Sequence, residues 1–236
     1  MKKRRKTPPS RRRTALKWLG ALVSLMLFFS VCGIYPLLPR QGAEYMRQCA
    51  GIAPMEVVKS FYDPTLVGMR TSRIYLMANE DALLLTASRF HPLMGWSGFW
   101  KGAVAVKEGL PVQPGYHMVS DRSGKMVYLY GRVDDPKVST FTCTLTLVSE
   151  DGGQEWIHAG TIQKTVGQDA LFTAGDGHTY FLFSIPLESK EHFLYQAFLS
   201  CTDGSGNHIL WPGRYQEHST ASFEIQESTS TSILNS

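Results

Sequence analysis

The sequence predicts an all-β sandwich that is preceded by one transmembrane helix. Short segments rich in β-branched and aromatic residues recur along the chain, and acidic, glycine-containing turns separate most of them. Residues 140–147 alternate strictly between threonine and apolar side chains, which is the pattern of a half-buried strand. Residues 18–35 carry no charge, and as a helix they would span about 27 Å, close to the hydrocarbon thickness of a bilayer.

The positive charge of the chain is concentrated at its N-terminus. Residues 1–17 hold nine of the 24 basic residues, and none of the 20 acidic residues precedes Glu44. Because positively charged flanks stay inside, we expect residues 1–17 to be a cytoplasmic tail and the C-terminal body to be extracytoplasmic. The rest of the chain has 15 basic and 20 acidic residues, and a mildly acidic body argues against a nucleic-acid partner.

The apolar segment allows three interpretations: an uncleaved anchor, a cleaved signal and a lipidated signal. Trp18 and Tyr35 stand at its ends, where amphipathic rings suit the membrane interface. No small-residue cleavage site follows the segment cleanly, and the residues before Cys32 match a lipobox poorly. An uncleaved signal-anchor helix that contacts the membrane through residues 18–35 is the preferred interpretation.

The body divides by composition into four segments. Residues 36–44 contain two prolines and a glycine and are predicted to be a linker, and AEYMRQCAG (43–51) is predicted to form a brief helix that Gly51 and Pro54 end. Residues 45–119 are predicted to hold N-terminal strands, a hairpin that turns at residues 79–81 and an aromatic loop at residues 91–102. Residues 120–226 are predicted to form the sandwich, and residues 227–236 a disordered tail.

The stretch YLYGRVDDPKVSTFTCTLTLVSEDGGQEW (128–156) resembles the first half of bacterial immunoglobulin-like modules. It has a strand with a central glycine, an Asp-Pro turn, a long alternating strand and an acidic glycine-rich hairpin. HFLYQAFLSCTDGSGN (192–207) is similar to a late strand of such modules. The resemblance covers residues 120–226 and implies an immunoglobulin-like sandwich, a fold that by itself says little about function.

The segment SEDGGQEW (149–156) also resembles the Asp-box hairpin of sialidase-type propellers. An Asp box recurs once per blade, and each blade takes about 40–50 residues. The other acidic turns of the chain do not repeat this pattern, so we interpret the match as coincidental and the segment as an ordinary β-hairpin.

The immunoglobulin-like resemblance implies that Cys143 and Cys201 lie on antiparallel neighbouring strands. An extracytoplasmic compartment permits a disulfide between them, and two buried free thiols are the alternative. Cys32 lies in the apolar segment and Cys49 just outside it. No Cys-x-x-Cys pair is present, so no structural zinc site is expected.

No catalytic, cofactor-binding or metal-binding residues are predicted. The seven histidines are scattered, and only His208 and His218 form a loose candidate pair. Calcium at the acidic turns is an alternative, but turn-forming aspartates need no metal to explain them; those aspartates are Asp134, Asp135, Asp151 and Asp203. Neither a nucleophile elbow nor a phosphate-binding loop is present.

Trp96, Phe99 and Trp100 are the candidate interaction surface. Rings gathered among glycines can stack on sugars, enter a membrane interface or hold a protein. The alternative, which we prefer, is that they plug the open end of the sandwich or its junction with the preceding strands.

These features together predict a non-catalytic, membrane-anchored interaction or structural module of a bacterial envelope. A component of an envelope sensing or assembly system is one alternative, and a carbohydrate-binding or glycan-active protein is another. The protein or glycan partner is not identified by the sequence.

Overall fold

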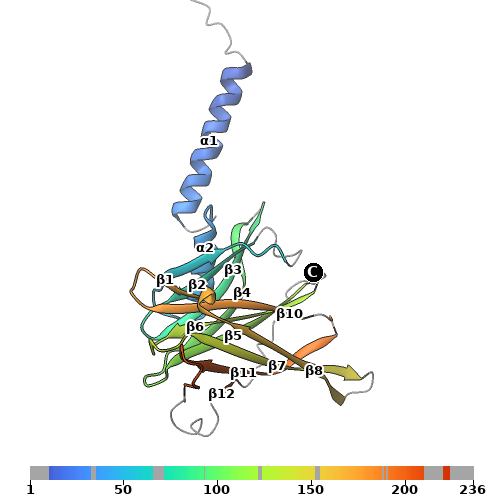
Figure 1. The fold of residues 1–236 in the computed structure, drawn as a ribbon. Helices are drawn as coiled ribbons and strands as arrows, with labels where there is room; N and C mark the ends of the chain where they lie inside the picture. The colour runs from blue at the N-terminus through green and yellow to red at the C-terminus, as the bar shows by residue number, and fades with distance from the viewer. Residues whose placement is uncertain are drawn as a thin grey trace, which may run out of the picture.

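The computed structural model describes residues 11–32, 36–65, 72–92, 94–121, 124–151, 155–187, 189, 191–209 and 220–223. It confirms a mostly β fold with one N-terminal apolar helix (Figure 1). The expected tail at residues 227–236, the first ten residues of the basic tail and His218 lie outside the described residues.

The helices are α1 (Arg11–Val31) and α2 (Pro39–Cys49), and a short 3-10 helix, η2, covers Gln168–Ala170. The first five strands are β1 (Glu56–Phe61), β2 (Ser72–Ala78), β3 (Ala82–His91), β4 (Gly95–Ala105) and β5 (Val112–Ser120). The others are β6 (Lys125–Val133), β7 (Thr140–Asp151), β8 (Glu155–Val166), β9 (Leu171–Thr173), β10 (Thr179–Leu187), β11 (His192–Thr202) and β12 (Thr220–Phe223).

The described strands form three antiparallel sheets of four strands each. The first sheet is a meander in the order β1-β2-β3-β4. The second has the order β5-β6-β10-β9, and the third has the order β12-β11-β7-β8. The strand β5 therefore belongs to the same sheet as β6, although it precedes the expected sandwich boundary at residue 120.

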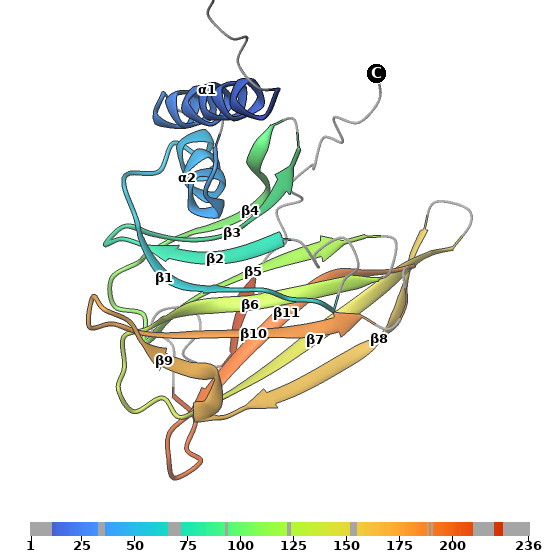
Figure 2. The ribbon, with the colours of Figure 1, turned by 90° about the horizontal axis from the view of Figure 1, so that it is seen from above.

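The three sheets stack as layers, with the second sheet in the middle and α2 on the outer face of the first (Figures 1 and 2). One core lies between the second and third sheets and includes Leu129, Phe141 and Phe181. A second core lies between the first and second sheets and includes Leu85 and Tyr130. A smaller cluster joins α2 to the first sheet.

This layering explains the composition of β6. Every residue of β6 except Arg132 is buried, because β6 lies inside the middle sheet and both of its faces are covered. A strand covered on both faces has no solvent side on which polar residues would alternate. By contrast, β7 faces a core on one side only and keeps its strict threonine and apolar alternation.

The hairpin at residues 149–156 is confirmed, since β7 and β8 pair as far as Asp151 and Glu155. Two element boundaries are corrected. The helix α1 ends at Val31 and not at Tyr35. The linker predicted at residues 36–44 is largely helical, because α2 begins at Pro39, where a proline at the first helical position loses no backbone bond.

The aromatic loop predicted at residues 91–102 is also wrong. Residues 95–102 belong to β4, which pairs with β3 from His91 to Ala82. Glycines and aromatic residues suggested a packed loop, but the long partner β3 supplies the backbone hydrogen bonds that extend β4 through this segment.

Candidate functional site

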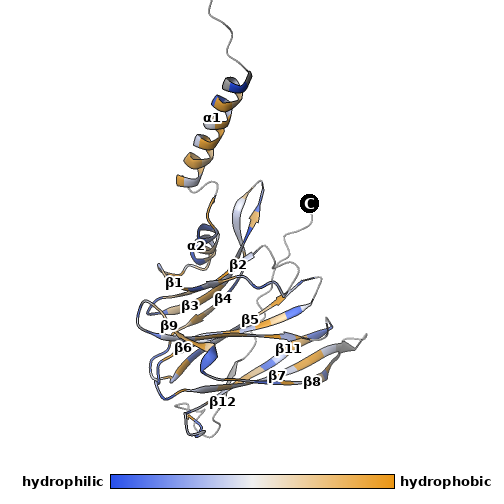
Figure 3. Ribbon diagram, turned by 45° about the horizontal axis from the view of Figure 1, so that its top comes forward, coloured by the Kyte–Doolittle hydropathy of each residue, from blue (hydrophilic) through white to orange (hydrophobic). Residues whose placement is uncertain are grey.

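The helix α1 is long and apolar enough to cross a membrane, and a signal sequence would satisfy the same criterion. Its segment Thr14–Val31 has a mean hydropathy of 1.7, and none of its residues is buried against the protein. In Figure 3 the apolar colour runs along most of α1, which stands apart from the body. Exposing an apolar helix of this length to water is unfavourable.

A compact junction joins α1 to the body. The Gln41 side chain in the first turn of α2 donates a hydrogen bond to Ser30 Oγ, near the end of α1, at 3.4 Å. The backbone N–H of Trp96 donates to the carbonyl oxygen of Pro36 at 2.8 Å. The end of α1, the start of α2 and the start of β4 therefore meet at one point.

Two glycines bring α2 onto the first sheet. A Cβ on Gly98 would lie 2.7 Å from the Gly42 carbonyl oxygen and would overlap the Met46 side chain. A Cβ on Gly42 would lie 3.0 Å from the carbonyl oxygen of Trp96. Because the backbones approach this closely, only residues without a side chain fit at both positions.

The three candidate aromatic residues do not share one surface. Residues 96 and 100 of a regular strand would point to the same face, but β4 has a bulge at Phe99, opposite the step from Ala87 to Ser88. Trp96 consequently pairs with Phe90 on the α2 side, with ring centroids 5.9 Å apart. Trp100 turns inward to the core between the first and second sheets.

Trp100 packs on a cross-strand pair of the middle sheet. Its ring lies 4.6 Å from that of His117 at an interplanar angle of 18°, and 6.0 Å from that of Tyr128. Burial lowers the pKa of His117 to about 4, so this imidazole is neutral at neutral pH. Trp100 thus fills the space between two sheets, whereas Phe99 is 38% exposed.

Cys143 and Cys201 are both buried in the core between the second and third sheets, and both are free thiols. They lie on the neighbouring strands β7 and β11, as expected, but Cys143 is paired with Leu199 and Cys201 with Phe141. Diagonal neighbours of this kind are about 7–8 Å apart, which exceeds the usual Cα separation in a disulfide. In the described structure the two thiols are unbonded, which corresponds to the alternative of two buried free thiols, and the disulfide is left to a chemical test.

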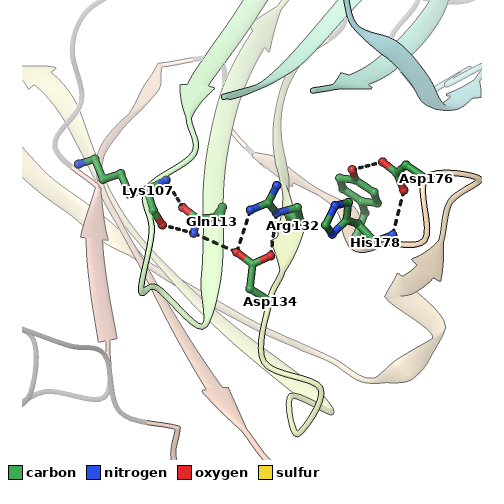
Figure 4. Close-up of polar contacts among 7 residues, drawn as sticks. Lys107, Gln113, Arg132, Asp134, Asp176 and His178 are labelled. Carbon is green, nitrogen blue, oxygen red and sulfur yellow. Dashed lines mark hydrogen bonds and ion pairs between the residues drawn. The ribbon is translucent and has the colours of Figure 1, made fainter. Parts of the chain in front are cut away.

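A polar network holds the loops at one end of the sandwich (Figure 4). The Gln113 amide donates to the Lys107 carbonyl at 2.6 Å and to Asp134 Oδ2 at 3.1 Å. Arg132 Nε donates to Asp134 Oδ1 at 2.7 Å. Arg132 and Asp134 are two residues apart, so they point to the same side of the strand end.

A second part of this end is closed by Asp176. Tyr180 Oη donates to Asp176 Oδ2 at 2.5 Å, and the His178 backbone N–H donates to Asp176 Oδ1 at 2.9 Å. Burial and the hydrogen bond to Asp176 raise the pKa of Tyr180, which keeps the phenol protonated as the donor. Nearby lies an open hollow of about 620 Å³, whose lining includes Asp134, Asp135 and His178.

The carboxylates of this network accept hydrogen bonds from other groups of the protein. Asp134 accepts hydrogen bonds from the Gln113 and Arg132 side chains on its two oxygens, and Asp176 accepts one from the Tyr180 hydroxyl and one from the His178 backbone N–H. Asp203 similarly accepts bonds from Ser205 and Asn207 within its own turn. Over the part of the chain that the structure describes, no group of three or more His, Cys, Asp or Glu residues is arranged to hold a metal.

The four aspartates considered for calcium do not gather at one place. Asp134, Asp135 and Asp203 follow strand ends at the same end of the sandwich, since Thr202 pairs with Thr140. Asp151 lies at the opposite end of β7.

Sequence reasoning missed the polar bond that joins the first sheet to the middle one. Tyr128 Oη donates to the buried Asp63 at 2.6 Å. Burial would raise the pKa of Asp63, but hydrogen bonds from Thr65 and Tyr128 outweigh it and lower the pKa below its usual value. No local sequence signal pairs these residues, which are 65 positions apart.

No model of a protein family, no curated protein and no solved structure matches this chain. Function is therefore inferred from geometry alone.

Proposed function

We propose that this chain is a non-catalytic interaction or structural module of a bacterial envelope, anchored in the membrane by α1 with its body outside the cytoplasm. The observation that carries the proposal is the exposed apolar helix α1, which is joined to the body by the hydrogen bond between Ser30 and Gln41 and by that between Pro36 and Trp96. The basic residues before the apolar segment favour a cytoplasmic N-terminus.

The same proposal assigns residues 112–223 to an immunoglobulin-like sandwich. Immunoglobulin domains have one sheet in the order A-B-E-D, and those with a C′ strand have a second sheet in the order G-F-C-C′. The orders β5-β6-β10-β9 and β12-β11-β7-β8 agree with these when the strands are lettered along the chain. An experimental structure of the whole chain with a different strand order would refute the assignment.

A binding role is preferred over catalysis because Asp134 at the open hollow is held in a structural network by Gln113 and Arg132. The carbohydrate alternative gains no support from Trp100, which is stacked on His117 and Tyr128 and faces away from Trp96. Sugar platforms require accessible ring faces.

Protease added to intact protoplasts tests the location of the body. We expect the body to be digested from outside, while an epitope tag placed before Lys2 survives until the membrane is permeabilised. Protection of the body in intact protoplasts would contradict the proposed orientation. Release of the body into the medium with a new N-terminus would show that the helix is a cleaved signal.

A further inference from the structure

The junction between α1 and the body has a second feature, the exposed tip of the β3–β4 hairpin. We define the hairpin tip by Arg89, Phe90, Met94 and Trp96. Phe90 is 46% exposed and Met94 is 62% exposed, although both are large apolar side chains. Leu38, just before α2, is 61% exposed.

The hairpin tip is held close to the end of the apolar helix. Trp96 bonds to Pro36, which is five residues beyond Val31, the last residue of α1. An extended chain covers at most about 3.3–3.6 Å per residue, so Pro36 lies within about 18 Å of the end of the helix. The bond between Gln41 and Ser30 brings the start of α2 closer still. In Figure 1 the β3–β4 hairpin rises beside α2 to about the level of the lower end of α1.

The position of the tip relative to a bilayer follows from this geometry. If α1 spans the hydrocarbon, its end reaches the headgroup layer, which adds about 5–8 Å on each side of the hydrocarbon core. The β3–β4 hairpin rises to about the level of the end of α1, which brings its apolar side chains within reach of the layer where aromatic and aliphatic groups of surface-bound proteins are found. Arg40 in the first turn of α2 and Arg89 in β3, whose guanidinium lies over the Phe99 ring, are exposed and carry positive charge that lipid phosphates attract.

We propose that the hairpin tip and Leu38 dock into the outer headgroup layer of the membrane that α1 spans, with Arg40 and Arg89 toward lipid phosphates. This inference rests on the proposed membrane anchor. The occupant of the apolar surface is the lipid bilayer, because the bonds to Pro36 and Ser30 hold the surface beside the membrane segment. Membrane contact through both α1 and the hairpin tip would fix the orientation of the body. The hairpin tip cannot move independently of α2, because α2 and β4 are closely packed through Gly42 and Gly98.

Site-directed fluorescence in reconstituted vesicles tests the docking. In the full chain, Cys32→Ser and Cys49→Ser remove the exposed cysteines, and one new cysteine is labelled with an environment-sensitive dye. The labelled protein is reconstituted into phosphatidylcholine–phosphatidylglycerol vesicles. The vesicles are prepared with or without a spin label on the lipid headgroup, which quenches the dye. The test site is Met94→Cys. The control for the span is Leu25→Cys, read with an acyl-chain spin label. The control for a site outside the proposed docking surface is Ser205→Cys, in the exposed turn after β11 of the third sheet.

We expect the dye at position 94 to shift to shorter wavelength and to lose most of its emission to the headgroup quencher, while the dye at position 205 keeps its emission. Adding Phe90→Asp should weaken the quenching at position 94. Quenching at position 25 without quenching at position 94 would overturn the docking and leave the anchor standing. A blue shift at position 94 without lipid quenching would identify a protein contact, which also overturns it. Absence of quenching at both positions would overturn the anchor and the docking together.

Discussion

Trp100 of β4 lies almost flat on His117 of β5, with ring centroids 4.6 Å apart and an angle of 18° between the planes. This contact joins the first sheet to the middle sheet, and Gly102 beside it leaves room for His117 and the Tyr130 hydroxyl. It places Trp100 in the interior of the stack and leads to the first two predictions.

Replacing Trp100 with alanine should lower the free energy of unfolding by about 3 kcal/mol, because a large ring is lost from a packed interlayer. Replacing Phe99, whose ring is 38% exposed, should cost less than about 1 kcal/mol. Urea denaturation of both variants in detergent micelles measures the difference. Equal, small effects would show that Trp100 is not a structural plug and would restore it as a candidate binding residue.

Stability should fall as the pH drops from about 6.5 toward 4, because burial lowers the pKa of His117 to about 4 in the folded state while the unfolded value stays near 6.5. In this window the unfolded chain binds a proton that the folded chain does not. The loss amounts to at most about 3 kcal/mol. His117→Phe, which keeps a ring on Trp100, should flatten the pH profile of the unfolding free energy between pH 6.5 and 4. His158→Gln, a change at an exposed histidine, should leave the profile as it is.

Cys143 and Cys201 should remain free thiols that do not react in the folded protein. Burial raises the pKa of each thiol to about 12, so almost no thiolate is present at neutral pH. Alkylation followed by mass spectrometry should label the exposed Cys49 in the native protein. Both core cysteines should be labelled only once the protein is unfolded, and no reductant should be needed. Two core cysteines that stay unlabelled after unfolding until reductant is added would prove the disulfide.

Gly98→Ala should loosen α2 from the first sheet and destabilise the protein by about 1–3 kcal/mol, because the added methyl meets Met46 and the Gly42 carbonyl. Gly204→Ala is the matched control, since a Cβ there has no neighbour within 4 Å. Hydrogen exchange should be faster in residues 39–49 of the Gly98 variant and unchanged in the control. Unaltered exchange in α2 would mean that the glycine contact does not hold the junction together.

Local sequence patterns were sufficient to predict most of the secondary structure. The uncharged segment predicted α1, alternation predicted β7, and turn residues at 79–81 and 149–156 predicted the two hairpins correctly. These features depend on near neighbours: side-chain period, backbone propensity and turn chemistry act over a few residues. Such patterns also separated the apolar helix from the β-rich body.

Only the tertiary structure decided which faces meet. A single bulge at Phe99 reverses the side of the sheet on which Trp100 lies relative to Trp96, and no periodicity reveals it. The register of β11 against β7 places Cys201 two residues from the position opposite Cys143, a shift that changes the outcome of a disulfide prediction. The bonds from Trp96 to Pro36 and from Tyr128 to Asp63 join segments about 60 residues apart. Such relationships arise from the stacking of three sheets, where long-range packing energy, and not local preference, selects one arrangement.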